Sequence, residues 1–135
     1  MKNKKSLNTE ESKIDGLLTK VFEEIESRSL GNSEAGKAIN FYDLDAMTQG
    51  LSPGNLYIIG GRPAMGKTSF VLNIAKNICQ FHNLPVCFFS LETSKKMLSY
   101  ILLSMDTGIE SGRLRTGRLT QDEWPFLGEA INLYS

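Results

Sequence analysis

The chain has 135 residues, 41% hydrophobic and 22% charged, which suffices for one modest core and is too short for several domains. Its 15 basic and 15 acidic residues cancel, so no global basic field indicates nucleic-acid binding; any such contact is local or made by neighbouring subunits. No segment reaches membrane-spanning length. Two cysteines without metal-site spacing, Cys79 and Cys87, are expected to be small buried residues in a reduced, intracellular setting.

The first expected element is an amphipathic helix after a polar, basic tail at residues 1–7. Asn8 and Glu11 are suited to capping it, and it is expected to end near Arg28. Its apolar side chains follow helical spacing: Ile14, Leu17, Leu18, Val21, Phe22 and Ile25. Such a stripe usually packs on its own domain, but a Gly-, Ser- and Asn-rich connection at 29–40 detaches this helix, which favours docking on another chain.

A phosphate-binding loop is predicted next, after a Pro53-Gly54 turn and an apolar run at 56–59 that reads as a buried strand. The loop follows the pattern G-x-x-x-x-G-K-[ST] over eight residues, Gly61, Arg62, Pro63, Ala64, Met65, Gly66, Lys67 and Thr68. Glycine at both ends lets the backbone aim its N–H groups at phosphates, Lys67 supplies positive charge, and Thr68 offers a hydroxyl to Mg²⁺. A purely structural Gly-rich turn would leave the Lys-Thr pair unexplained.

The context of the loop agrees with that interpretation. Apolar residues at helical spacing follow it: Phe70, Val71, Ile74, Ala75 and Ile78. The loop therefore precedes a helix N-terminus, where free N–H groups and the helix dipole favour an anion. A second apolar run at 86–91 predicts another buried strand, which completes a βαβ unit with parallel pairing.

Glu92 comes at the carboxyl end of this second strand, the edge of a parallel sheet where ligands bind. A carboxylate there is able to orient the water that attacks a γ-phosphate. The alternative is a glutamate in the first turn of the next helix, favoured by the dipole, and spacing alone does not separate the two. The single histidine, His82, lies in a turn-like segment and is expected to be a solvated surface residue.

Two more helices are expected towards the end of the chain. One carries Met97, Leu98, Ile101, Leu102 and Met105, with Thr93 or Ser94 as its cap. These methionines, with Phe88 and Phe89, are interpreted as core. The last helix has a capping box at 120–123 and is expected to start late or bend at Pro125. Three arginines lie between these helices: Arg113, Arg115 and Arg118. They either contact phosphates of a nucleotide or of DNA, or pair with carboxylates of an adjacent subunit. The alternative is that they belong to a solvated polar connection between the two helices.

Three stretches in order, FYDLDAMTQGLSPGNLYIIGGRPAMGKTSFVLNIA, PVCFFSLE and SGRLRTGRLTQDEW, closely resemble the motor domain of the DnaB-type hexameric replicative DNA helicases. The resemblance runs from about Glu23 to the end of the chain. It implies an α/β, RecA-like P-loop NTPase fold with a parallel sheet, here truncated and preceded by an amphipathic linker helix. The family usually has Met where this chain has Thr93, and commonly has Arg near the position of Tyr100.

The resemblance also implies a function. ATP and Mg²⁺ bind at residues 61–68, Glu92 acts in hydrolysis together with Lys67, and the complete protein translocates on single-stranded DNA as a ring, a hexamer, in the cytoplasm with the nucleoid or in an organelle stroma. The expected organisation is a basic tail and linker helix at 1–28, a flexible connection at 29–40, and the first part of the motor domain at 41–135. The matching linker helix docks on the neighbouring subunit of the ring.

Two other functions stay open at this point. The chain is either a non-catalytic fragment that binds nucleotide and docks on a full-length helicase, or another RecA-like DNA-dependent ATPase that does not unwind DNA. The resembled family also has a second acidic strand associated with Mg²⁺, DNA-contacting loops and an arginine finger, all of which come after the stretches matched here. Without them we expect an exposed strand edge, poor solubility and reliance on partners.

Overall fold

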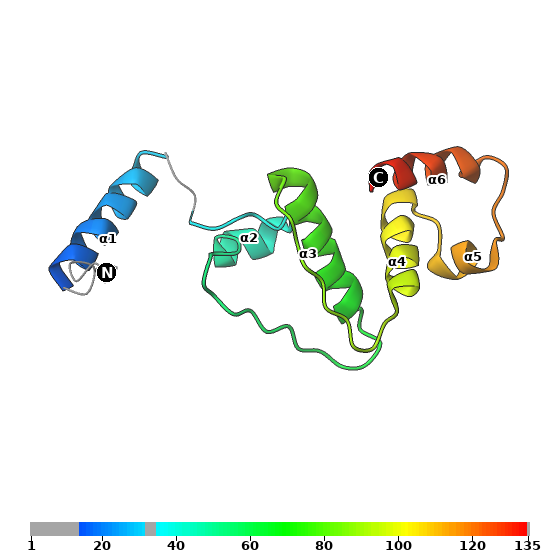
Figure 1. The fold of residues 1–135 in the computed structure, drawn as a ribbon, viewed down its shortest axis with the longest axis horizontal. Coiled ribbons are helices and arrows are strands. Elements are labelled where there is room, and N and C mark those ends of the chain that lie inside the picture. The colour runs from blue at the N-terminus through cyan, green and yellow to red at the C-terminus, as the bar shows by residue number, and fades with distance from the viewer. Residues whose placement is uncertain (1–13, 32–34, 135) are drawn as a thin grey trace, which may run out of the picture.

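The computed structural model describes residues 14–31 and 35–134, and within them it contains six helices. In chain order they are α1 (Ile14–Ser29), α2 (Tyr42–Thr48), α3 (Lys67–His82), α4 (Lys95–Thr107), α5 (Ser111–Thr116) and α6 (Glu123–Asn132). Figure 1 shows α3 in the centre, α4 to α6 on one side of it, and α1 standing apart on the other. The caps predicted at Asn8 and Glu11 lie outside the described residues.

Helix α1 confirms the predicted amphipathic helix and packs against none of the other described helices. None of its residues is buried, and Phe22 and Ile14 expose 66% and 73% of their surface. An apolar stripe that wide is stable in water only when something covers it, because most helical stability comes from packing such a face.

Residues 35–51 form a short clasp against α3 that the sequence did not predict. Lys37 and Leu51 pair as an isolated antiparallel bridge, with N–O distances of 2.9 and 2.8 Å. The backbones approach so closely that a Cβ on Gly50 would lie 2.5 Å from the carbonyl oxygen of Lys37. Gly50 also has φ +79°, a conformation that glycine adopts without steric cost.

Polar side chains fasten this clasp to the second half of α3. The amide of Asn77, a buried residue, donates to the carbonyl of Ile39 at 2.7 Å. His82 Nε2 lies 2.8 Å from the carbonyl oxygen of Ala38, so His82 is half-buried and joins two segments instead of being a solvated surface residue. Near the start of α3, the rings of Phe41 and Phe70 pack in a tilted arrangement, with centroids 4.9 Å apart and an interplanar angle of 57°.

The predicted parallel sheet is not confirmed, since the described residues contain no strand. Segments 55–60 and 85–90 are irregular, and no backbone hydrogen bond joins them to each other. A parallel strand needs neighbours for its N–H and C=O groups, and the described part of the chain offers none. The exposed fractions still alternate along 56–59, from 87% for Leu56 and 86% for Ile58 to 43% for Tyr57 and 40% for Ile59.

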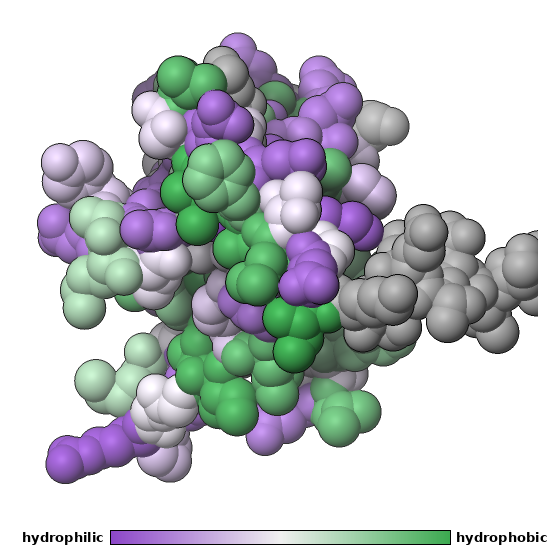
Figure 2. Space-filling model, turned by 90° about the vertical axis from the view of Figure 1, so that its left-hand side faces the viewer, coloured by the Kyte–Doolittle hydropathy of each residue, from purple (hydrophilic) through white to green (hydrophobic). Residues whose placement is uncertain are grey.

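The same lack of cover corrects three other expectations. Cys79 and Cys87 are both exposed instead of buried, and Phe89 exposes 91% of its surface instead of lying in a core. Figure 2 shows apolar residues gathered in a band across one face of the molecule. The buried apolar residues are few and come from several elements: Ile39, Leu72, Ile78, Ile109, Leu114 and Ala130.

One polar cluster joins α3 and α4 to the residues that follow α6. The Lys76 ammonium pairs with the Asp106 carboxylate, which also accepts a hydrogen bond from the Tyr134 hydroxyl. Burial, reinforced by the hydrogen bond to Asp106, raises the pKa of Tyr134. None of the helices described is both long enough and apolar enough to cross a membrane.

Candidate nucleotide site

The phosphate-binding loop predicted at 61–68 leads directly into α3. Gly66 is the N-cap of this 16-residue helix, with φ +80°, and no described side chain caps the helix. The first N–H groups of α3 are therefore left for another acceptor, and the helix dipole adds partial positive charge there. Ala64 also has a left-handed backbone, with φ +62°, which is uncommon for a residue with a side chain and is typical of functional loops.

Lys67 closes the loop from within. Its ammonium donates to the carbonyl oxygens of Gly61 and Arg62, at 3.2 and 3.1 Å. The side chain is half-buried and packs against the loop at Gly61, where an added Cβ would lie 3.5 Å from Lys67 Cγ. The Lys67 ammonium and the uncapped N–H groups at the start of α3 together form a set of donors suited to the oxygens of a phosphate chain. The residues present thus fit the phosphates of a nucleoside triphosphate.

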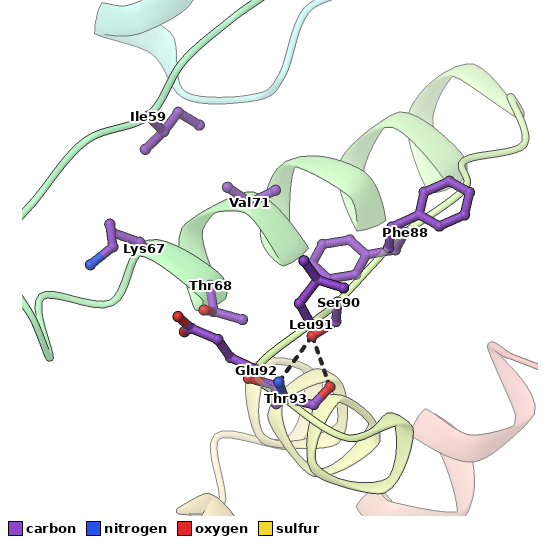
Figure 3. Close-up of a pocket in the computed structure, with 10 residues that line it drawn as sticks. Ile59, Lys67, Thr68, Val71, Phe88, Ser90, Leu91, Glu92 and Thr93 are labelled. Carbon is purple, nitrogen blue, oxygen red and sulfur yellow. Dashed lines mark hydrogen bonds between the residues drawn. The ribbon is translucent and has the colours of Figure 1, made fainter.

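Glu92 lies across a cavity of about 370 Å³ from the start of α3. Lys67, Thr68 and Glu92 all line this cavity, with apolar walls from Val71 and Phe88. In Figure 3 the Glu92 carboxylate extends towards Thr68 and Lys67, although it comes from the segment before α4. The structure therefore brings together the three residues that the sequence singled out for chemistry.

The chain supplies few ligands for a metal ion. Within residues 14–31 and 35–134, no three His, Cys, Asp or Glu side chains gather in a group that could hold one. Mg²⁺ commonly binds through one or two protein ligands together with substrate phosphates and water. The Thr68 hydroxyl, at the mouth of the loop, fits that arrangement only with a nucleotide present.

The segment carrying Glu92 is held at both ends by serine hydroxyls. Ser90 Oγ donates to the carbonyl oxygen of Thr93 at 2.8 Å and accepts from the N–H of Thr93 at 3.1 Å. Ser94, one of the two predicted caps, accepts from the N–H of Met97 at 3.3 Å and begins α4. The sequence reasoning missed Ser90; its spacing of three residues before Thr93 was the available signal, because serine often bonds the nearby backbone in turns.

The arginine cluster is divided by the structure. Arg113 forms a bidentate pair with Glu123 of its own chain, with both N–O distances 2.8 Å, so its guanidinium is engaged between α5 and α6. The Arg113 guanidinium, then the N–H of Thr120, hold the pKa of the Glu123 carboxyl below its ordinary value. That N–H bond is half of the predicted capping box, and α6 starts late, at Glu123, as expected from Pro125. Arg115 and Arg118 are both exposed.

Comparison with known proteins gives consistent matches. Residues 36–135 match the family described as DnaB-like helicase C terminal domain. The chain is 51% identical to the replicative DNA helicase DnaB of Nostoc sp. strain PCC 7120 over 84% of its length, and 47% identical to a probable replicative DNA helicase of Trieres chinensis over 84%. It spans only 13% and 25% of those two proteins.

A solved structure supports the same relationship. This structure, an ATPase domain, superposes on the chain with a TM-score of 0.78 at 34% sequence identity, covering 90% of this chain and 42% of that one. The fold therefore corresponds to part of a helicase ATPase domain, even though the sheet is not formed among the described residues.

Proposed function

Since the chain belongs to the family of DnaB-like helicase C-terminal domains, we propose that it forms the nucleotide-binding part of an ATP-dependent replicative DNA helicase. In the complete protein, ATP hydrolysis would be coupled to translocation on single-stranded DNA and to duplex unwinding. The observation that carries this proposal is the convergence of Lys67, Thr68 and Glu92 on one cavity at the N-terminus of α3.

Each residue has a distinct role in this proposal. The N–H groups of residues 61–68 and the Lys67 ammonium would bind the β- and γ-phosphates, and the Thr68 hydroxyl would hold Mg²⁺. Bound Mg²⁺ supplies charge neutralisation on the phosphates. Glu92 would accept a proton from, or orient, the attacking water. The phosphate loop and Mg²⁺ bind the phosphates and neutralise their charge, but hydrolysis also needs a group that acts on the water.

We assign the remaining organisation to assembly. Residues 1–28 would act as a tail and linker helix, 29–40 as a flexible connection and 41–135 as the first part of the motor domain. The uncovered stripe of α1 supports docking on a neighbouring subunit in a ring, with six subunits as the expected number, since that face has no cover among the described residues of its own chain.

Nucleotide binding and hydrolysis by the chain test the proposal. Wild type should bind a fluorescent ATP analogue in the presence of Mg²⁺, and Glu92→Gln should keep that affinity within about twofold while lowering hydrolysis by ~100-fold or more. Glu129→Gln, an exposed glutamate on α6, is the matched control and should change neither quantity. A chain that is folded but retains no analogue at millimolar concentration would refute the proposal.

A second function is favoured by the uncovered face of α1. In it, the chain binds nucleotide without turnover and docks on an intact helicase of the same family. Sedimentation with and without that helicase distinguishes the two, because the docking function requires co-migration and the enzyme function requires hydrolysis by the chain alone.

A further inference from the structure

One hydroxyl, that of Ser90, closes the turn that presents Glu92. Ser90 Oγ makes two hydrogen bonds to the backbone of Thr93, one as donor and one as acceptor, and thereby closes the four residues 90–93 (Figure 3). Both bonds use the backbone of Thr93, so its side chain takes no part in them.

Apart from Ser94, which caps α4 just after it, the described residues offer this turn little other support. Leu91 is fully exposed, at 103%, so no packing holds it, and segment 85–90 before it forms no strand. The Glu92 carboxylate makes no hydrogen bond or ion pair with any other described residue. Because no other described residue holds the carboxylate, the backbone of the turn determines the point from which the Glu92 side chain reaches into the cavity.

We propose that Ser90 is a positioning residue for Glu92. By bonding both backbone polar groups of Thr93, its hydroxyl fixes the turn and with it the Cα of Glu92, at a distance from which the carboxylate reaches the cavity beside Lys67 and Thr68. The proposal rests on the proposed function and deepens it, since it names the residue that aims the water-orienting group. Displacing a reacting group by about 1 Å is enough to lower a rate ~100-fold, so one lost brace has a measurable effect.

The test compares three serine variants of the full chain. Ser90→Ala removes both hydrogen bonds, and Ser90→Thr restores a hydroxyl. Ser99→Ala is the matched control, because the Ser99 hydroxyl is exposed and bonds only the carbonyl of Lys95 within α4. In Ser90→Ala, hydrolysis at saturating ATP should fall ~10- to 100-fold while the dissociation constant for the analogue stays within about twofold. Ser90→Thr should recover most of the rate.

A second readout does not depend on nucleotide. The Thr93 amide accounts for one of the two bonds, so its hydrogen exchange, followed by NMR, should accelerate ~10-fold or more in Ser90→Ala and remain unchanged in Ser99→Ala. Equal exchange in wild type and Ser90→Ala would overturn the inference, and so would faster exchange with an unchanged hydrolysis rate. A wild-type chain that binds no analogue would instead refute the proposed function, and Thr93 exchange alone would then decide whether Ser90 holds the turn.

Discussion

Replacing Lys67 by alanine is the sharpest test of the loop, because one ammonium serves two purposes. In the structure it bridges the carbonyl oxygens of Gly61 and Arg62 and so keeps the loop curled, and it comes from the first residue of α3, whose end has no side-chain cap. Lys67→Ala removes that charge and also leaves two carbonyls without their donor.

The size of the effect follows from the half-buried position of Lys67. Two unit charges about 4 Å apart attract by about 4 kcal/mol at an effective dielectric constant of ~20, and hydrogen bonds to charged groups are worth about 1.5–3 kcal/mol. Part of this is offset by desolvation, so we expect a net loss of about 2–4 kcal/mol. At about 1.4 kcal/mol for each factor of ten, affinity should fall ~30- to 1,000-fold.

The assay is an equilibrium titration of wild type, Lys67→Ala and Lys96→Ala with a fluorescent ATP analogue and Mg²⁺. Lys96 lies on α4, is exposed and does not line the cavity, so its replacement should change affinity by less than about twofold. Circular dichroism checks that each variant keeps its helices. Equal affinities for wild type and a folded Lys67→Ala would refute the reasoning that this loop binds phosphate.

The other predictions concern stability. Gly50→Ala should lower the free energy of unfolding by about 2–5 kcal/mol, because φ is +79° there and a Cβ would lie 2.5 Å from a backbone oxygen. Gly108→Ala is the control: φ is +71° but the space around it is open, so the free energy of unfolding should fall by only about 1 kcal/mol. Equal unfolding midpoints in urea for the two variants would contradict this. Asp106→Asn should lower the free energy of unfolding by about 3 kcal/mol, because it leaves the Lys76 charge without its partner and the two side chains are only 9% and 14% exposed. Replacing both residues by apolar ones should lower the free energy of unfolding by less, because no unpaired charge remains. The ion pair between Arg113 of α5 and Glu123 of α6 should be sensitive to acid, because the pKa of Glu123 in the folded chain lies below its ordinary value of 4.5. Its contribution to stability is therefore complete above pH 4.5 and is lost as the pH falls through the lower folded-state pKa. Titration of Glu123 by NMR measures this, and a midpoint at the ordinary value would count against the pair.

The parts of the structure that the sequence predicted well are those determined by neighbouring residues. Helices α1, α3, α4 and α6 follow from apolar spacing, and the cap at Ser94 and the late start of α6 follow from residues within one turn. The phosphate loop is eight consecutive residues, so its geometry is also local. Helix α2 was missed because it is seven residues long and has no side-chain cap at Phe41.

Contacts between distant residues were predicted less well. The pair of Arg113 with Glu123 spans ten positions, and the bond of Asn77 to Ile39 spans 38, so neither follows from a local pattern. His82 and the cysteines were misplaced for the same reason, because burial depends on which distant segment supplies the cover. Ser90 was missed for a different reason: its partner is only three residues away, but a serine in a turn is a far more common pattern than a carboxylate at the end of a strand.

The phosphate loop and Glu92 depend to different degrees on the sheet for their positions. The predicted strands at 56–59 and 86–91 are apolar on both faces, as strands buried between two layers are, yet only one face meets the rest of the molecule. Burial of each exposed side chain would add about 1.5–3 kcal/mol to the free energy of unfolding. Summed over Leu56, Ile58, Phe89 and Leu91, this is comparable to the whole stability of a small domain. The loop keeps its shape without that contribution, because its hydrogen bonds join residues 61, 62 and 67. Glu92 has no such local network beyond Ser90, so its position is the part of the site that completion of the sheet would stabilise most.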